Sequence, residues 1–168
     1  MNTPYLEASV AKAVKAIIKK PKIILATHDS AFHADDVFAS ALLHILFPLM
    51  VPGQKYTITR NPVSSPILEK ADLVFDCGRI YDASKLRFDH HQTGSAGTYE
   101  NGIKYSSFGL LWKHFGATAC ALYVEKFSGK TISKKIAEGM VKSVTQVLVA
   151  GVDAMDNGQD IYKPTYDH

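Results

Sequence analysis

Cysteine is scarce in this sequence of 168 residues, which contains only Cys77 and Cys120, in different segments. Isolated cysteines argue against a disulfide framework and against a Cys-x-x-Cys zinc site, so we expect an intracellular, reducing compartment. No apolar run reaches the ~18 residues that a membrane-spanning helix requires, and no membrane is expected as a partner. P-loop, Gly-x-Ser-x-Gly and His-Glu-x-x-His patterns are also missing, which excludes P-loop NTPases, α/β hydrolases and zincins.

A strong excess of charge of one sign is missing too. The formal net charge is +3 and the isoelectric point about 8.8. This mildly basic balance permits a phosphate or nucleic-acid partner without requiring one. With 46% hydrophobic and 21% charged residues, the chain has the composition of an ordinary globular domain with a sizeable core.

The hydrophobic pattern predicts strands that alternate with helices. Strands are expected at residues 22–27, 56–59, 71–75 and 86–88, and helices at 5–20, 37–47, 67–70, 107–115, 118–127 and 133–155. Pro48 is expected to end the second of these helices and Gly116 the fourth. The alternation predicts an α/β fold with an open, mainly parallel sheet and helices on both faces.

Acidic and histidine residues gather where the apolar runs end. The clusters are Asp89-His90-His91, then His28 with His33 and Asp35, then Asp76, and finally Asp153 with Asp156. In open α/β sheets, sites form outside the carboxyl ends of the strands, where His28 and Asp76 are expected. Imidazoles mixed with carboxylates suit Mn, Fe, Co or Zn, so the clusters predict a dinuclear metal site.

Individual residues in these clusters allow simpler interpretations. Asp36, in the first turn of a helix, is expected only to complement the helix dipole, whereas Asp35, beside the histidines, is expected to bind metal. Asp153 is favoured over Asp156 as a ligand, because Asp156 precedes a turn at Asn157-Gly158. Arg60, after a strand, could meet a phosphate or simply remain solvated.

Two residues have expected catalytic roles. Asp76 is the natural carboxylate to bridge two metal ions, and His91 can donate a proton to a leaving oxygen.

The motifs and their order along the chain resemble those of the DHH phosphoesterase superfamily, and most closely those of the melanocyte-proliferating-gene family of DHH-type exonucleases. The resemblance runs from about Pro21 to Gly158. It rests on Thr27-His28, Phe32-His33-Ala34-Asp35, Val74-Phe75-Asp76-Cys77-Gly78, Arg87-Phe88-Asp89-His90-His91-Gln92, Ser107-Phe108-Gly109-Leu110 and Val152-Asp153-Ala154-Met155-Asp156-Asn157-Gly158. Ala34 and Asp36 depart from the family pattern, which usually has Cys and Glu there. His33 stands where other DHH enzymes use Asp.

The resemblance implies a ligand set and a domain plan. His28, His33 and Asp76 would hold one metal ion, and Asp35, Asp76, His90 and Asp153 the other. Residues 21–160 would form a DHH-type catalytic lobe. The apolar stripe near the N-terminus independently predicts an amphipathic helix at 1–20, and a tail without periodicity follows the lobe at 161–168. Since family members continue into a second lobe, the chain is expected to lack that lobe.

The expected function is a manganese-dependent 3′–5′ exonuclease acting on single-stranded RNA or DNA, with Mg²⁺, Co²⁺ or Zn²⁺ as other candidate ions. Alternatives are a pyrophosphatase or small-nucleotide phosphodiesterase on the same scaffold, or a metal-stabilised interaction module without catalysis. The resemblance implies a nuclear or mitochondrial location, with the cytoplasm as an alternative.

Overall fold

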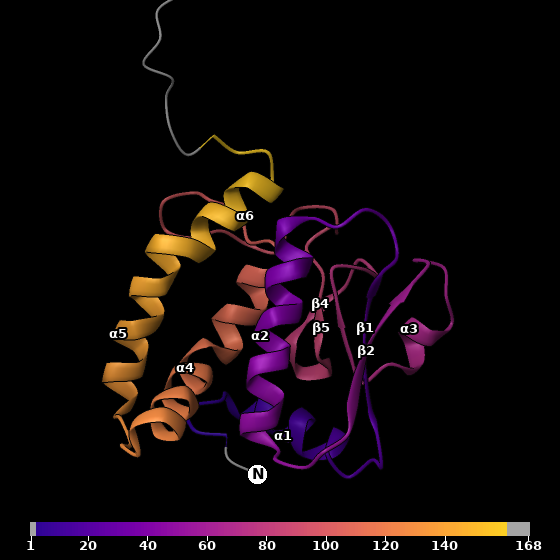
Figure 1. Ribbon diagram of the computed structural model, residues 1–168. Helices are drawn as coiled ribbons and strands as arrows, with labels where there is room; N and C mark the ends of the chain where they lie inside the picture. Colours follow the sequence, from indigo (N-terminus) through magenta and orange to yellow (C-terminus); the bar gives the residue numbers. More distant parts are fainter. Residues whose placement is uncertain (1–2, 161–168) are drawn as a thin grey trace, which may run out of the picture.

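A computed structural model describes residues 3–160 of the chain (Figure 1), so the predicted tail at 161–168 lies outside the described residues. The strands are β1 (Ile23–His28), β2 (Tyr56–Asn61), β3 (Leu73–Phe75), β4 (Tyr81–Asp82) and β5 (Arg87–Phe88). The helices are α1 (Ala8–Ile17), α2 (Ala34–Met50), α3 (Ile67–Lys70), α4 (Ser107–Ser128), α5 (Lys134–Val144) and α6 (Ala150–Asp156). A 3₁₀ turn covers Ala83–Lys85, and a π-helical turn, Thr145–Val149, joins α5 to α6.

The strands form one five-stranded sheet in the order β2-β1-β3-β5-β4. All neighbouring pairs are parallel except β4 with β5. The chain leaves β1 through α2 to reach β2 on one side, then returns through α3 to β3 on the other side of β1. This reversal opens a crevice at the carboxyl ends of β1 and β3, the usual position of a site in such sheets.

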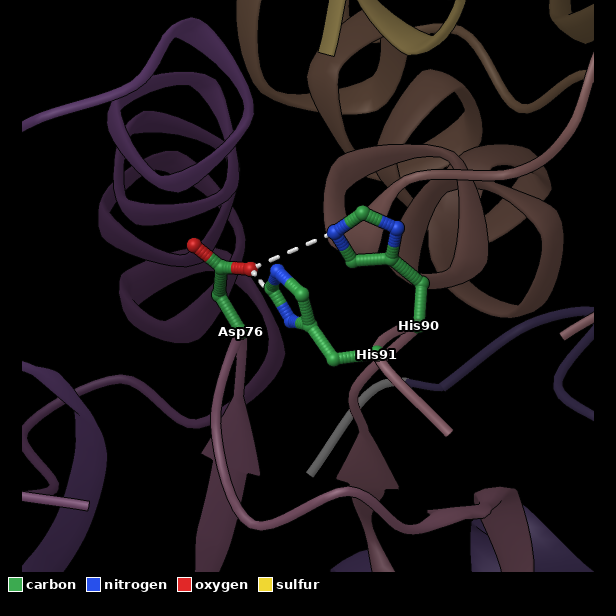
Figure 2. Close-up of side chains that lie close together, drawn as sticks. All are labelled: Asp76, His90 and His91. Carbon is green, nitrogen blue, oxygen red and sulfur yellow. Dashed lines mark ion pairs between the residues drawn. The ribbon is translucent and has the colours of Figure 1, made fainter. Parts of the chain in front are cut away.

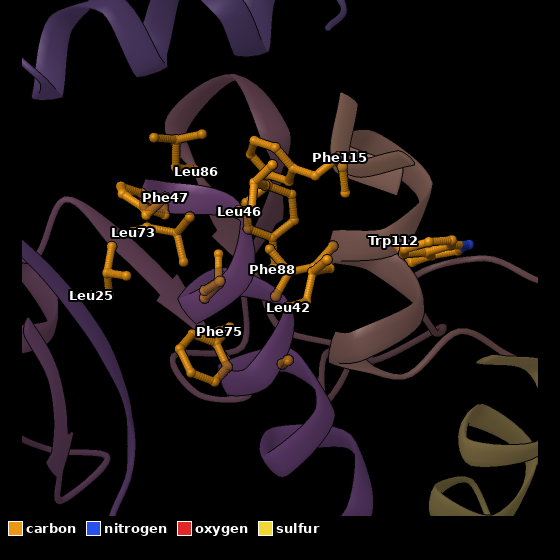
Figure 3. Close-up of a cluster of buried hydrophobic side chains, with 14 of the residues drawn as sticks. Leu25, Leu42, Leu46, Phe47, Leu73, Phe75, Leu86, Phe88, Trp112 and Phe115 are labelled. Atoms are coloured by element: carbon orange, nitrogen blue, oxygen red, sulfur yellow. The ribbon is translucent and has the colours of Figure 1, made fainter. Parts of the chain in front are cut away.

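Alternate residues of the central strands face two layers of unequal size. Leu25, Leu73 and Phe75 belong to the main core, to which α1, α2 and α4 contribute (Figure 3). Ala26 and Val74 face the opposite side and pack in a small cluster with Leu68 of α3. The predicted α/β fold with a mainly parallel sheet is confirmed. Among residues 3–160, α3 is the only helix that contributes to the smaller cluster.

Helix α2 does not end at Pro48, as the sequence predicted, but continues to Met50. The proline lies in the last turn of the helix, where few further backbone hydrogen bonds depend on it.

Gly116 does not end a helix either, because α4 runs unbroken from Ser107 to Ser128. A Cβ atom at Gly116 would lie 3.1 Å from the Trp112 ring and 3.2 Å from Val141 of α5. The glycine therefore allows α4 and α5 to approach closely, and the signal taken for a stop is a packing requirement.

Within residues 3–160, no helix is long and apolar enough to cross a membrane.

Candidate metal centre

The acidic and histidine side chains converge at the carboxyl edge of the sheet. His28 is the last residue of β1, Asp76 follows β3 directly, and Asp89-His90-His91 follows β5. Asp35 and Asp36 come from the first turn of α2, and Asp156 is the last residue of α6. The parallel strands thus bring together residues that are distant in the sequence.

Asp76 lies between two groups of potential ligands. Its Oδ2 is 2.9 Å from His28 Nε2. Its Oδ1 is 3.5 Å from His90 Nε2 and 3.7 Å from His91 Nδ1 (Figure 2). The buried Asp76 also has a φ of 54°, a left-handed conformation that costs a non-glycine residue about 1–2 kcal/mol. Such backbone strain is typical of functional positions.

Asp36 completes the group on the β1 side. Its Oδ2 lies 3.1 Å from His28 Nε2, yet neither carboxylate oxygen of this buried residue has a hydrogen-bond partner. Ser30 Oγ lies 2.6 Å from Nδ1 of His28, so a hydrogen bond there fixes the orientation of the ring whose Nε2 faces the carboxylates. His28, Asp36 and Asp76 therefore place ligand atoms close enough together to share one cation.

The second group surrounds His90. Its Nε2 lies 3.1 Å from Asp156 Oδ2 and 3.9 Å from Asp35 Oδ2. Asp35 is fully buried and neither of its oxygens has a hydrogen-bond partner. His33, which is exposed, has its Nδ1 3.9 Å from Asp156 Oδ1 and can share a cation with Asp35 and Asp156.

The protonation equilibria reflect this crowding of carboxylates. Burial, together with the charges of Asp76 and Asp156, raises the pKa of Asp35 to about 8. Burial lowers the pKa of His90, but Asp156 and Asp76 outweigh it and raise that pKa to about 10. Within residues 3–160, no lysine or arginine forms an ion pair with Asp35, Asp36, Asp76 or Asp156. Buried carboxylates that have histidines but no lysine or arginine beside them fit divalent cations.

His91 has a different environment from its neighbour. Its side chain is half exposed, and Asp89 Oδ1 lies 2.7 Å from its Nδ1. That hydrogen bond raises the pKa of His91. Asp89 also accepts hydrogen bonds from the backbone N–H groups of Arg79 and His91, which hold its carboxylate in place.

Asp153 lies outside both groups. The hydroxyl groups of Tyr99 and Ser106 and the backbone N–H of Gly109 donate to its carboxylate. The sequence favoured Asp153 over Asp156 as the ligand, but the structure brings Asp156, not Asp153, to His90. The position of Asp153 is fixed by its neighbours, as expected, but these neighbours lie at the start of α4 and not at the candidate metal groups.

A cavity of about 360 Å³ opens onto the groups. It is lined by His28, Ser30, His33, Val63, Asp76, Cys77, Gly78, Arg79, Asp89 and His91. Its volume is in the range of sites for small ligands.

Asp36 and Asp156 lie in the candidate ligand groups, although the sequence did not predict either of them as a ligand. For Asp156 a signal existed, because a carboxylate at the C-terminal end of a helix is disfavoured by the dipole unless a cation lies nearby. For Asp36 no such signal exists, since acidic residues are common in the first turn of helices.

The sequence has relatives along most of its length. The model of the MYG1 exonuclease family, described as an uncharacterised protein family (UPF0160), matches residues 24–168. The MYG1 protein of Dictyostelium discoideum is 31% identical over 150 residues, which are 86% of this chain and 42% of that protein. The MYG1 exonuclease of Bos taurus is 29% identical over 175 residues, 94% of this chain and 42% of the relative. No solved structure matches significantly.

The chain thus spans about two fifths of the length of these relatives, because the aligned region makes up 42% of each of them. The family match nevertheless includes the candidate ligands from His28 to Asp156. The chain belongs to the MYG1 exonuclease family.

Proposed function

We propose that this chain carries a dinuclear manganese site of a phosphodiester hydrolase, a 3′–5′ exonuclease of single-stranded RNA or DNA. The observation that supports it most is the two-sided position of Asp76, whose oxygens face His28 on one side and His90 on the other. A carboxylate placed in this way is suited to bridge two cations about 3.5–4 Å apart.

In this proposal the ligands divide between the two groups. His28, Asp36 and Asp76 would hold one ion. Asp76, Asp35, His90 and Asp156 would hold the other, with the exposed His33 as an additional ligand. Compared with the set that the family resemblance implies, Asp36 enters, Asp156 replaces Asp153, and His33 moves to the second ion.

The bound ions would supply Lewis-acid stabilisation of the charge that develops on the phosphoryl oxygens. His91 would donate the proton to the leaving oxygen. Its Nδ1 is bound to Asp89, which leaves Nε2 for the substrate, and Asp89 raises the pKa of His91, which favours the protonated form that a general acid needs. The role of Asp89 is to orient His91.

The nuclease activity is proposed because relatives carry the name MYG1 exonuclease. The Asp89-His90-His91 motif after β5 also supports membership of the DHH phosphoesterase superfamily. Manganese as the preferred ion, the polarity of digestion and an intracellular location are parts of the same proposal.

A turnover assay tests the function directly. The purified chain would be incubated with Mn²⁺ and single-stranded RNA or DNA labelled at the 5′ end, with inorganic pyrophosphate and dinucleotides in parallel reactions. Stepwise shortening of the labelled strand from its 3′ end is the expected result. Hydrolysis of pyrophosphate or dinucleotides without shortening would favour the alternative enzymes, and no turnover of any substrate would favour a non-catalytic module.

A further inference from the structure

We propose that Phe32 and Arg60 form a nucleotide-binding platform at the rim of the metal centre, with Phe32 stacking on a base and Arg60 placing positive charge beside a phosphate. Phe32 lies in the short loop between β1 and α2, and it is 66% exposed. The guanidinium carbon of Arg60 lies 3.7 Å from the centroid of its ring. This inference rests on the proposed nuclease function and names the part of the site that recognises the base.

The platform is attached to the metal centre at both of its ends. Phe32 directly precedes His33, and His33 lies next to His28, with ring centroids 6.1 Å apart. Arg60 Nε donates to the backbone carbonyl of His28 at 3.2 Å, and its Nη2 donates to the carbonyl of Ser30. His28 is a proposed metal ligand, and Ser30 and His33 line the cavity. These contacts therefore fix the position of the Phe32–Arg60 pair relative to the metal centre.

Arg60 stacks on Phe32 and still has free N–H donors. A guanidinium group has five N–H donors, and the carbonyls of His28 and Ser30 engage only its Nε and Nη2. Arg60 is exposed and forms no ion pair within residues 3–160. It can therefore contact a phosphate while its flat face remains stacked on the ring.

Phe32 differs from the other exposed phenylalanine and tyrosine side chains in its position. Among the described residues, those are Tyr123 and Phe127. Their ring centroids lie 4.5 Å apart in the last turns of α4, so the two rings pack on each other. Phe32 alone lies at the carboxyl edge of the sheet. An aromatic ring there matches the way single-stranded nucleic acids are bound, by bases stacked on aromatic rings next to a positively charged backbone contact.

Fluorescence anisotropy would measure binding of a labelled single-stranded tetranucleotide with a hydrolysis-resistant terminal linkage, in the presence of Mn²⁺. A second tetranucleotide would lack the base at its 3′ end. Phe32→Ala should bind the complete tetranucleotide about tenfold more weakly than the wild type, as expected for the loss of one stacked base. It should bind the tetranucleotide without the 3′ base as the wild type does. Phe32→Tyr should retain wild-type binding, and Phe32→Leu, which is apolar but not aromatic, should not.

Phe127→Ala is the matched control, because Phe127 is 70% exposed but lies on α4, away from the carboxyl edge. It should leave both affinities unchanged. If the wild type binds the complete tetranucleotide and Phe32→Ala binds it equally well, the platform is wrong while the proposed function stands. If the wild type binds neither tetranucleotide, both the platform and the proposed nuclease function fail.

Discussion

Asp153 and Asp156 lie less than one turn apart on α6 but have different partners. Asp156 Oδ2 contacts His90 at 3.1 Å, whereas Asp153 accepts hydrogen bonds from Tyr99, Ser106 and Gly109. From this difference we infer a metal-binding role for Asp156 and a structural role for Asp153.

Asp156→Asn should therefore weaken binding of one of the two ions by at least about 100-fold, since a ligand is lost. Asp153→Asn should leave metal affinity within about tenfold but lower the free energy of unfolding by about 1–3 kcal/mol, because the amide keeps one acceptor oxygen and turns an NH₂ donor toward buried groups that now donate to the carboxylate. Isothermal titration with Mn²⁺ and urea denaturation of both variants measure these effects. A larger loss of metal affinity for Asp153→Asn would return the ligand role to that residue.

The pair of Asp89 and His91 makes a prediction about pH dependence. A general acid works in its protonated form, so turnover should fall as the pH rises through the pKa of His91. Asp89 raises that pKa, and Asp89→Asn should therefore move the alkaline limb of the kcat profile to lower pH. His91→Ala should lower kcat by about 100-fold or more while retaining both ions. An alkaline limb that is the same in the wild type and in Asp89→Asn contradicts the proposed role of the pair.

The sequence predicted most of the residues that meet at the site, because acids and histidines at the ends of parallel strands must share one edge. It did not predict that Asp36 of α2 joins Asp35 at the site, or that Asp156 rather than Asp153 of α6 reaches His90. The position of each carboxylate depends on the rotation of its helix against the sheet, and in α6 a rotation by a fraction of a turn would exchange Asp153 for Asp156.

At the scale of elements, helix α4 is capped by a residue of another helix. The side chain of its N-cap, Ser106, does not bond to the first turn, and Asp153 Oδ1 instead accepts the Gly109 N–H at 3.1 Å. A Cβ atom at Gly109 would lie 1.8 Å from Asp153 Oδ2. The glycine thus makes room for a carboxylate that joins α6 to the start of α4.

Gly109→Ala should destabilise the protein by at least about 1–3 kcal/mol, since the added methyl group displaces Asp153. Gly139→Ala is the control, because Gly139 lies in α5 and a Cβ atom there has nothing within 4 Å. This control should be neutral or stabilise by up to about 1 kcal/mol. Urea denaturation compares the two, and equal stabilities would show that Asp153 moves aside without cost.

Most of the strands and helices followed from hydrophobic periodicity, and their alternation predicted the mainly parallel sheet, although the single helix expected at 133–155 is divided into α5, a π-helical turn and α6. The helix ends predicted at Pro48 and Gly116 are wrong: Pro48 is tolerated in the last turn of α2, and Gly116 serves the packing of α4 against α5. Strand β4 was not predicted at all. Its residues Tyr81 and Asp82 are too few to show an alternating pattern, and the strand exists through pairing with β5.

For the molecule as a whole, the site concentrates negative charge that the mildly basic net charge of +3 conceals. The pKa of Asp35 is raised to about 8 and that of His90 to about 10. At neutral pH both groups therefore hold protons that a cation must displace. Metal binding and proton release should be coupled.

Titration with Mn²⁺ at pH 7 in buffers of different ionisation enthalpy should reveal release of about two protons per chain. Below the pKa of Asp35 the protonated carboxyl competes with the metal, so apparent affinity should fall from pH 8 to pH 6. Saturating Mn²⁺ should also raise the Tm, and chelation should lower it again. Binding heats that do not depend on the buffer would show that these groups are not ligands.

The central claim is that Asp76 bridges two ions, and metal stoichiometry tests it most directly. Inductively coupled plasma mass spectrometry after dialysis against Mn²⁺ should give about two ions per chain for the wild type. The variant Asp76→Asn should lose both ions, because one carboxylate serves both groups, while Asp156→Asn should retain about one. Full occupancy in Asp76→Asn, with its fold confirmed by circular dichroism, would contradict the account.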